Sequence, residues 1–277
     1  MRGVTNTPPP AHVIRAFGAT RDPERLAGGQ GTSWRLGEIV LKRIDMAEDE
    51  LEWQADLLPS LQARGFRVSC PRRTGDGVLV VDGWCAWEYV AGHHQGRRWA
   101  DIVHAGEAFH AALAGVPRPA FLDRRTDPWA VADRAAWGDL PIRDFFRVKH
   151  VPRLARARRP LDTQGQLIHG DLTGNVLFAD GLAPAIIDFS PYWRPRAFAS
   201  AVVIADAFIW EGADITLLSA VADISQFAQY LLRALIYRAI TDRLFREDEP
   251  LRPDNADPYL AAVELACRLA EAEQRRV

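Results

Sequence analysis

Two short stretches in the second half of the chain restrict its fold most. Residues 169–178 read HGDLTGNVLF, and residues 186–189 read IIDF. They present Asp171, Asn175 and Asp188, and each of these polar residues lies beside a short apolar run. Apolar runs bounded by Gly, Asp and Pro are typical of short buried strands. The pattern predicts a loop that carries a carboxylate and an amide, followed by a hairpin strand that carries a second carboxylate.

The three polar side chains suit a particular chemistry. An amide and a carboxylate that converge from neighbouring strands offer hard oxygen ligands, which suit Mg²⁺ that holds phosphates. Asn175 and Asp188 are therefore the candidate metal ligands, and Asp171 remains to orient and deprotonate an attacking hydroxyl. In the alternative interpretation, Asp171 and Asn175 only cap backbone groups of a turn. The metal-binding interpretation is favoured because supporting features occur along the chain in the order that the chemistry requires.

The spacing of these residues resembles that of a known family. Protein kinases carry His-x-Asp, then four residues and Asn, with Asp-Phe-Gly downstream. Here three residues separate Asp171 from Asn175, and Gly170 stands where protein kinases have Arg. This shorter form is similar to the aminoglycoside phosphotransferase family, the small-molecule branch of the kinase-like fold. The resemblance covers about residues 24–210, and the C-terminal tail is supported by its helical pattern alone.

The resemblance implies an α+β, bilobal protein-kinase-like fold with a small antiparallel-sheet N-terminal lobe and a larger, mostly helical C-terminal lobe. Residues 1–91 are the expected nucleotide-binding lobe, and residues 92–277 are expected to hold the catalytic loop and the acceptor site. The resemblance also implies a reaction in which the γ-phosphate of Mg-ATP moves to a hydroxyl of a small molecule. ATP and Mg²⁺ are the expected cofactors.

A glycine-rich turn lies between two predicted strands near the N-terminus. It contains Gly28, Gly29, Gly31 and Thr32. Backbone N–H groups in such a turn can approach phosphate oxygens closely. It is not a Walker A loop, because no Gly-Lys-Ser/Thr follows the glycines. Alone, such a turn is more often a plain hairpin, but its position shortly before Lys42 favours a role at the phosphates.

Lys42 ends the apolar strand that begins at Ile39. A lysine in this position either ends a buried run at an exposed edge or points inward at an anion. The resemblance implies the second role, in which Lys42 holds the α- and β-phosphates of the nucleotide.

The helix predicted over residues 46–62 should supply a carboxylate that pairs with Lys42. Its apolar residues form a stripe, and acids crowd its first turns. Glu48, Glu50 and Glu52 compete for the pairing, and Gln54 falls at one of the alignments. Glu52 lies closest to the register that the resemblance implies.

Residues 87–92 resemble the hinge of this family, where backbone groups meet the adenine edge. The resemblance implies that Glu88 and Val90 make this contact, for which only their backbone is needed. The lobe boundary is therefore expected near residues 90–96. Two adjacent histidines follow at positions 93 and 94, but adjacent side chains diverge on any element, so we expect a solvated loop and no metal pair.

From residue 98 the pattern becomes helical. Apolar residues at three-four spacing predict a helix from Trp99, in which Gly106 leaves room for close packing. Asp127-Pro128 predicts the capped start of another helix. Residues 144–159 are predicted to be helical in part, with an interruption near Pro152, and their basic run is more typical of a solvated face than of a docking patch for an anionic partner. Further helices are predicted at 197–211, 214–222, 224–245 and 258–275.

Composition excludes several classes of protein. A net charge of −2 gives no general attraction to nucleic acid or to an anionic membrane. The apolar stretch 197–210 contains Asp206 and is too short to span a bilayer. The resemblance implies a structural role for Asp206, in which its carboxylate accepts hydrogen bonds from the backbone of the catalytic loop. The first ten residues lack the apolar core of a signal peptide, and the three cysteines lack metal-binding or disulfide spacing. We expect a cytoplasmic enzyme with a small-molecule partner, without nucleic acid or membrane; the oligomeric state stays open.

Departures from the family pattern bear on regulation and on the acceptor. Gly170 removes the arginine that reads a loop phosphate, and the segment 191–195 is too short for a phosphorylation-controlled loop, so we expect no such activation. This segment indicates a divergent subfamily whose acceptor need not be an aminoglycoside. Acids such as Glu211, Asp214 and Glu264 would face a cationic acceptor, although acids scattered on helices are mostly solvated.

Two other functional classes stay open on the sequence. One is a non-catalytic ATP-binding or regulatory module with the same fold, although Lys42, Asp171, Asn175 and Asp188 are all present. The other is a metal-dependent hydrolase that uses His169 with the two aspartates. Such a hydrolase has no need of a glycine-rich turn or of the strand lysine.

Overall fold

The computed structural model describes residues 7–26, 32–246 and 257–275. The chain divides into two compact units, residues 1–94 with 174–188 and residues 95–173 with 189–277. The sequence predicted a single boundary after residue 91. The compact division differs from it because the hairpin at 174–188 pairs with a strand of the first unit.

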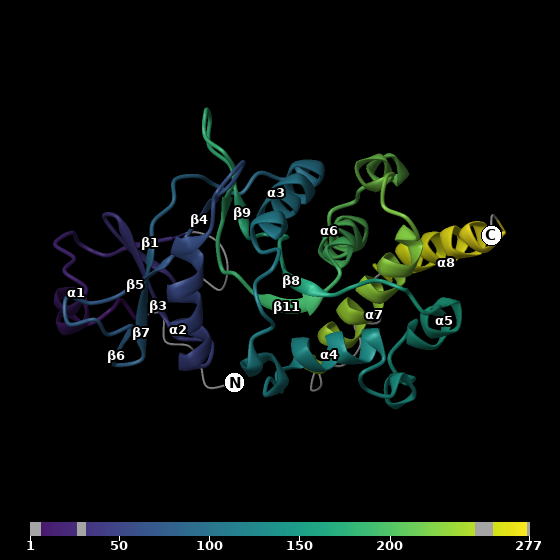
Figure 1. Cartoon of the computed structure of the whole chain (residues 1–277), viewed down its shortest axis with the longest axis horizontal. Helices are drawn as coiled ribbons and strands as arrows, with labels where there is room; N and C mark the ends of the chain where they lie inside the picture. Colours follow the sequence, from purple (N-terminus) through teal and green to yellow (C-terminus); the bar gives the residue numbers. More distant parts are fainter. Residues whose placement is uncertain (1–6, 27–31, 247–256, 276–277) are drawn as a thin grey trace. The chain divides into compact units, whose positions relative to one another are not determined.

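The first unit contains an antiparallel sheet. Its main strands follow the order β1-β2-β3-β7-β5, and β6 also pairs with β7 (Figure 1). Its elements are α1 (Ala11–Ala16), β1 (Glu24–Arg25), β2 (Trp34–Leu36), β3 (Ile39–Arg43), α2 (Glu48–Leu57), the 3-10 turn η1 (Leu58–Ser60), β4 (Arg67–Val68), β5 (Pro71–Arg72), β6 (Val80–Val81), β7 (Trp84–Glu88), β9 (Val176–Leu177) and β10 (Ala185–Ile186).

The hairpin between β2 and β3 places Lys42 in the sheet. Gly37 adopts a φ of 66°, which the two-residue turn requires and which glycine adopts without strain. Strand β3 then lies between β2 and β7 and buries Leu41 in a small core with Trp84. Lys42 points to the other face and is 8% exposed. The exposed-edge alternative for Lys42 is therefore excluded.

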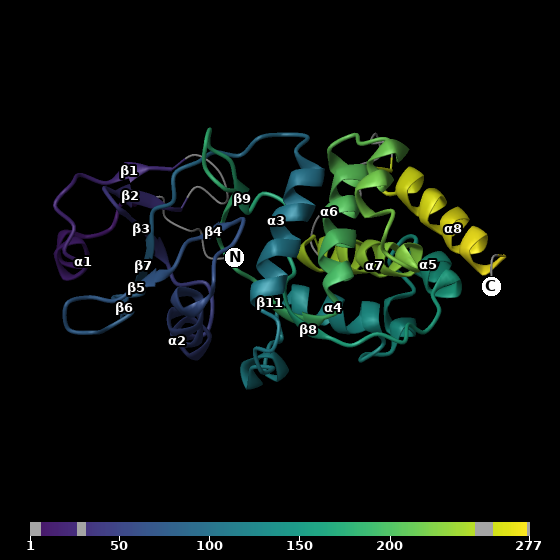
Figure 2. The same cartoon turned by 45° about the horizontal axis from the view of Figure 1, so that its top comes forward.

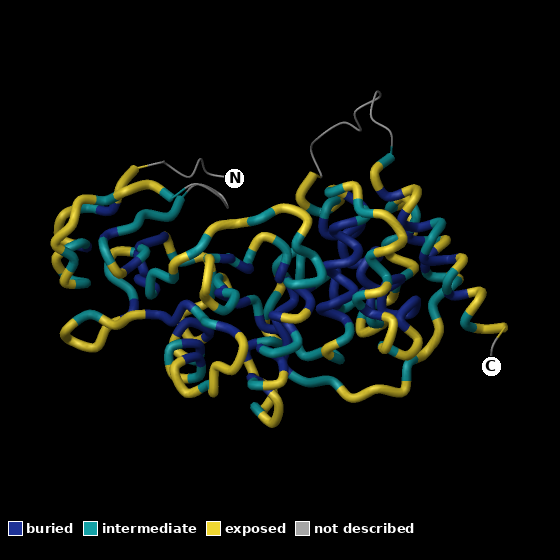
Figure 3. The backbone as a smooth tube through the Cα atoms, turned by 90° about the horizontal axis from the view of Figure 1, so that it is seen from above, coloured by how far each residue is buried: buried dark blue, intermediate teal, exposed yellow. Residues whose placement is uncertain are grey.

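The second unit is mostly helical. Its elements are α3 (Trp99–Ala112), η2 (Ala120–Asp123), α4 (Pro128–Trp137), η3 (Ile142–Phe145), α5 (Val151–Ala157), β8 (Gln166–His169), β11 (Pro191–Arg194), α6 (Arg196–Trp210), η4 (Ile215–Val221), α7 (Phe227–Phe245) and α8 (Leu260–Gln274). Helices α6 and α7 pack against each other, and α3 runs beside α6 (Figure 2). The buried residues of this unit gather at its centre (Figure 3). Most residues of α6 and α7 are buried.

Several local predictions are confirmed in the second unit. The Asp127 carboxylate caps α4 by accepting the N–H of Ala130 at 3.0 Å, and Gly138 ends that helix in the left-handed region. A Cβ atom on Gly106 would lie 2.4 Å from Leu172 Cδ1, so the absence of a side chain lets α3 pack directly against the residue that follows Asp171. Close packing at Gly106 thus helps to place the loop.

Other predicted helices are shorter than expected. The helix predicted over 46–62 ends at Leu57, and Pro59 lies in the 3-10 turn that follows, since proline cannot continue the hydrogen-bond ladder. Within the basic run, only residues 151–157 form an α-helix. The segment predicted at 214–222 is the 3-10 helix η4. Within the residues that the structure describes, no helix is long and apolar enough to cross a membrane.

Candidate active site

A β-hairpin brings two of the predicted site residues together. Val176 pairs with Ile186, and the Ile187 N–H donates to the Asn175 carbonyl at 3.0 Å. This register places Asn175 and Asp188 at the same end of the hairpin, as the sequence predicted. Asp188 has a φ of 49°, a left-handed conformation that is uncommon outside glycine. Such residues cluster at functional sites, where the surrounding structure holds them.

Lys42 contacts this end of the hairpin. Its Nζ lies 2.7 Å from Asp188 Oδ1 and 3.6 Å from Asp45 Oδ2. Burial acts to lower the pKa of Lys42, but the two carboxylates outweigh it and raise the pKa above its ordinary value. A hydrogen bond therefore joins Lys42, the candidate phosphate ligand, to Asp188, a candidate metal ligand. Lys42 keeps its positive charge in this environment.

The predicted pairing of Lys42 with Glu52 is wrong. Glu52 Oε1 instead lies 2.7 Å from Arg73 Nη2, and its side chain is 54% exposed. The helix phase explains the difference: α2 buries Glu50 and Gln54, and residue 52 lies about 200° around the helix from residue 50. Of the three competing acids, Glu50 is the buried one.

Of the other predicted nucleotide residues, the structure describes Thr32, Glu88 and Val90. Gly28, Gly29 and Gly31 lie outside the described residues, and Thr32 is half-buried before β2. Glu88 ends β7; its N–H donates to the Cys70 carbonyl at 2.8 Å, and its own carbonyl accepts the Ser69 hydroxyl. Val90 is half-buried in the segment that follows.

The two adjacent histidines follow this segment. The backbone of His93 exchanges two hydrogen bonds of 3.0 Å with Phe178. The first histidine therefore joins the segment after β7 to the hairpin through its backbone. Among the described residues, no group of three or more His, Cys, Asp or Glu side chains is arranged to hold a metal.

In the second unit, His169 organises the loop that carries Asp171. The ring is fully buried, and its Nδ1 accepts the N–H of Asp171 at 3.2 Å and that of Ser190 at 3.5 Å. Phe109 and Phe189 pack edge-on against the ring. His169 is thus a packing and backbone-bonding residue, which leaves its ring unsuited to the metal-ligand role that the hydrolase alternative requires.

His110, on α3, forms a hydrogen bond with the last residue of β8. Its Nε2 accepts the His169 N–H at 3.0 Å, so the ring must stay neutral at that nitrogen. Burial, with smaller contributions from His169 and Arg196, lowers the pKa of His110 to about 3. His110 was not among the site residues predicted from the sequence.

Because the buried His110 ring stays neutral, we expect the folded protein to lose stability in mild acid. An unfolded histidine titrates near pH 6.5, so protons favour the unfolded chain below that pH while the folded ring stays neutral. The free energy of unfolding should fall by about 2 kcal/mol from His110 alone between about pH 6.5 and pH 5. Melting curves at both pH values test this in the wild type and in His110→Gln, whose amide keeps an acceptor near the Nε2 position. The variant should lose less stability, and equal losses in the two proteins would contradict the assignment.

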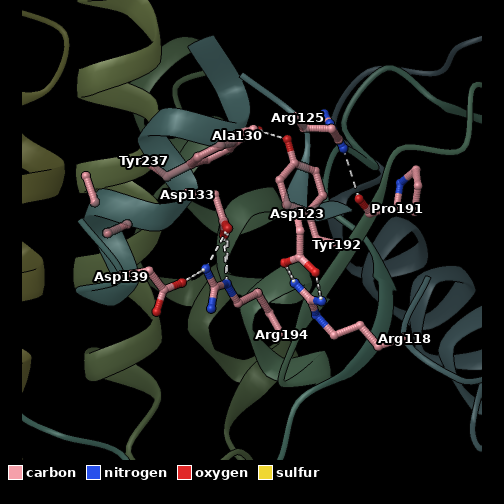
Figure 4. A network of polar contacts seen from close by, with 12 residues as sticks. Arg118, Asp123, Arg125, Ala130, Asp133, Asp139, Pro191, Tyr192, Arg194 and Tyr237 are labelled. Carbon is pink, nitrogen blue, oxygen red and sulfur yellow. Dashed lines mark hydrogen bonds and ion pairs between the residues drawn. The ribbon is translucent and has the colours of Figure 1, made fainter. Parts of the chain in front are cut away.

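Strand β11 covers the loop and is itself anchored by α4 and by residues on either side of that helix (Figure 4). Arg194 donates two hydrogen bonds to Asp133 Oδ2 and one to Asp139, and Arg125 donates to the Pro191 carbonyl at 3.1 Å. The strand pairs with β8, with Pro191 opposite His169. These contacts fix the strand that lies against the loop.

Gly170 is required by the ring of Tyr192. A Cβ atom at position 170 would lie 2.2 Å from Tyr192 Cδ2, and the Gly170 N–H donates to the Ser190 carbonyl at 2.9 Å. The sequence showed only that the arginine of protein kinases is missing. The structure shows that the space for any side chain is filled.

Asp171 is held by an arginine that sequence analysis missed. Arg238 Nη2, on α7, lies 2.6 Å from Asp171 Oδ1. The same guanidinium donates to both oxygens of Asp206 on α6, at 2.7 and 2.6 Å. Burial disfavours the cation, but Asp206 and Asp171 outweigh it and hold the pKa of Arg238 well above its ordinary value. A signal was present in the sequence, because an arginine among apolar helix residues needs a buried acid.

Asp206 has the structural role that the resemblance implied, with a different donor. The resemblance pointed to hydrogen bonds with the backbone of the loop. In the structure, both carboxylate oxygens accept from Arg238 instead.

The chain is similar to known phosphotransferases in sequence and in structure. The family model APH, described as the phosphotransferase enzyme family, matches residues 24–192. A search of curated proteins finds no match. The aminoglycoside phosphotransferase APH(4)-Ia, solved as a thermostable mutant with ADP and hygromycin B, is similar in structure with a TM-score of 0.56 and 14% identity, over 95% of this chain and 97% of that chain.

Two further solved structures are similar. Spectinomycin phosphotransferase APH(9)-Ia, with ADP and spectinomycin, has a TM-score of 0.51 and 14% identity, over 95% of this chain and 97% of that chain. The streptomycin–ATP complex of APH(2")-IIa has a TM-score of 0.53 and 12% identity, over 86% and 92%. At these identities the likeness shows the fold, and it confirms the predicted α+β, protein-kinase-like class. Since the family match spans more than half of the sequence, the chain belongs to the phosphotransferase enzyme family.

Proposed function

We propose that the protein transfers the γ-phosphate of ATP to a hydroxyl group of a small molecule. The observation that carries this proposal is the contact of Lys42 Nζ with Asp188 Oδ1, at the hairpin end that also holds Asn175. A cation and two oxygen donors in this arrangement suit a nucleotide triphosphate with its metal. The family match, and solved relatives that hold ADP or ATP, support the same reaction.

The nucleotide would be held by residues of the first unit. We assign the phosphates to Lys42 and to the turn formed by Gly28, Gly29, Gly31 and Thr32, and the adenine edge to the backbone of Glu88 and Val90. Lys42 suits this role because it is buried, positively charged and fixed in a central strand. Backbone N–H groups and a lysine are a recurring pair in phosphate recognition.

The donor chemistry of the hairpin fits Mg²⁺. This ion takes oxygen ligands and is usually bound through one or two carboxylates together with substrate phosphates and water. Asp188 would supply the carboxylate and Asn175 the amide oxygen. When bound, Mg²⁺ would offset the negative charge that develops on the phosphate oxygens during transfer.

Asp171 would act as the base. Its carboxylate accepts the proton of the acceptor hydroxyl while the hydroxyl oxygen forms a bond to the γ-phosphorus. The bond between the γ-phosphorus and the bridging oxygen breaks, and ADP leaves. Such transfers depend mainly on positioning and on electrostatic stabilisation, so the fixed orientation of the loop by His169 and Gly170 is part of the mechanism.

The acceptor of this chain need not be a polycation. Solved relatives hold hygromycin B, spectinomycin or streptomycin. In this chain, two of the acids considered for a cationic acceptor already have partners: Glu211 accepts the Trp99 indole N–H, and Asp214 caps Thr216. We therefore propose a small hydroxyl compound as acceptor, without requiring a polycation.

A screen for ATP consumption tests the proposed function. Aminoglycosides, macrolides, amino alcohols and sugars are offered with Mg-ATP, and Asp171→Asn serves as the blank for each. We expect at least one compound to accelerate ADP release by the wild type and not by the variant. Binding of Mg-ATP without turnover on any acceptor or on water would instead favour a non-catalytic ATP-binding module.

Asp188→Asn should weaken the binding of Mg-ATP by about ten- to a hundredfold, since even residues that only support a metal ligand have effects of this size. Isothermal titration calorimetry measures the change. Asp45→Asn is the matched control, because Asp45 also faces Lys42 but is more exposed and is no proposed ligand. Equal losses in the two variants would show that only the charge near Lys42 matters.

A further inference from the structure

We propose that Arg238 is a positioning residue for Asp171, which it holds in the orientation that accepts the proton of the hydroxyl. The inference rests on the proposed function, in which Asp171 is the base. It assigns a role in the reaction to a residue on α7, outside every motif that the sequence presents.

The arginine is anchored at one end and reaches the base at the other. Its Nε and Nη2 donate to the two oxygens of Asp206, a fork that fixes the plane of the guanidinium. The Asp206 side chain is 1% exposed and that of Arg238 8%, whereas that of Asp171 is 34% exposed. A rigid, buried pair thus presents one N–H group to a partly exposed carboxylate.

The contact with Asp171 goes beyond what charge balance requires. Asp206 alone neutralises the guanidinium, and two hydrogen bonds already join them. The third bond, from Nη2 to Asp171 Oδ1 at 2.6 Å, restrains the orientation of the Asp171 carboxylate. Because phosphoryl transfer depends on near-attack geometry, restraint of the base in the correct orientation increases the rate of the reaction.

Three elements converge on this restraint. Asp171 follows β8, Asp206 lies on α6 and Arg238 lies on α7. The neighbouring Tyr237 hydroxyl lies 3.3 Å from that of Tyr192, on the strand that covers the loop. Helices α6 and α7 are thereby connected to the base, and α7 is also connected to the strand beside it.

The test is steady-state ADP release from Mg-ATP with water as the acceptor. Arg238→Lys keeps the positive charge but loses the fork, so one ammonium cannot serve Asp206 and Asp171 in the same geometry. We expect kcat to fall by about ten- to a hundredfold while the KM for Mg-ATP stays unchanged. In Asp171→Asn, the added Arg238→Lys change should cause no further loss, because the two residues act as a unit.

Arg233→Lys is the matched control. Arg233 is a second buried arginine of α7, and it donates to the carbonyls of Gln229 and Arg159, not to the loop. It should lose stability with little change in kcat. If Arg238→Lys does not fold, the charge-balanced pair Arg238→Met with Asp206→Leu replaces it, since such apolar replacements of buried ion pairs often keep the fold. The pair should show the same loss of kcat.

The outcomes separate the two proposals. Unchanged kcat in a folded Arg238 variant, or additive losses in the double variant with Asp171→Asn, overturns the positioning role and leaves the proposed function standing. Turnover that survives in Asp171→Asn overturns the base and, with it, the role of Arg238. A wild type that binds Mg-ATP and releases no ADP with water or with any acceptor of the screen overturns both.

Discussion

Asp171→Asn should lower the turnover of ATP by about 10²–10⁴-fold, the range expected when a general base is removed. The amide cannot accept the proton of the hydroxyl, although it has the shape of the carboxylate. Its oxygen still accepts from Arg238 Nη2, so the loop should keep its conformation. Single-turnover measurement of ADP formation separates this loss from any change in product release.

Two controls make the result specific to the base. The affinity for Mg-ATP should stay unchanged in Asp171→Asn, because the proposed nucleotide residues Lys42, Asn175 and Asp188 are intact. The melting temperature should stay near that of the wild type. Turnover within a few-fold of the wild type, in a folded variant, would show that Asp171 is not the base.

Asp206→Ala should have the largest effect on stability. It leaves the buried Arg238 guanidinium without the fork that holds it, and breaking a buried ion pair at one partner costs about 3–5 kcal/mol. The remaining bond to Asp171 cannot replace two hydrogen bonds. Thermal melting of the whole chain gives the loss as a lowered midpoint.

Asp123→Ala is the comparison for this effect. Asp123 also forms a two-bond pair with an arginine, Arg118, but its side chain is 65% exposed. Water screens such a pair, so its removal should barely shift the midpoint. If the two variants melt alike, burial of the Asp206–Arg238 pair is not what stabilises this part of the fold.

The parts of the site that were predictable from the sequence depend on local patterns. Asn175 and Asp188 flank two short strands whose apolar residues and turn set their pairing, so their convergence follows from the register. Lys42 follows three aliphatic residues in a strand with a two-residue turn before it. In both cases a few neighbouring residues determine the geometry.

The parts that were missed depend on helix phase or on distant pairs. Glu52 was placed from a register that the leucine spacing of α2 does not determine, and the structure buries Glu50 instead. Arg238 lies 67 positions from Asp171, and nothing in the sequence states which buried acid an arginine on α7 will meet. Local periodicity predicts that such a residue needs a partner but not which one.

The close approach of Tyr192 to Gly170 also sets an order for evolutionary change. A loop with arginine at position 170, as in protein kinases, would need two substitutions, because the ring at 192 fills the space. Loss of the ring must come first, since a side chain gained at 170 beside an intact tyrosine passes through an overpacked intermediate. A single substitution at position 170 therefore cannot introduce the arginine that reads a loop phosphate, because its effect depends on which residue occupies position 192.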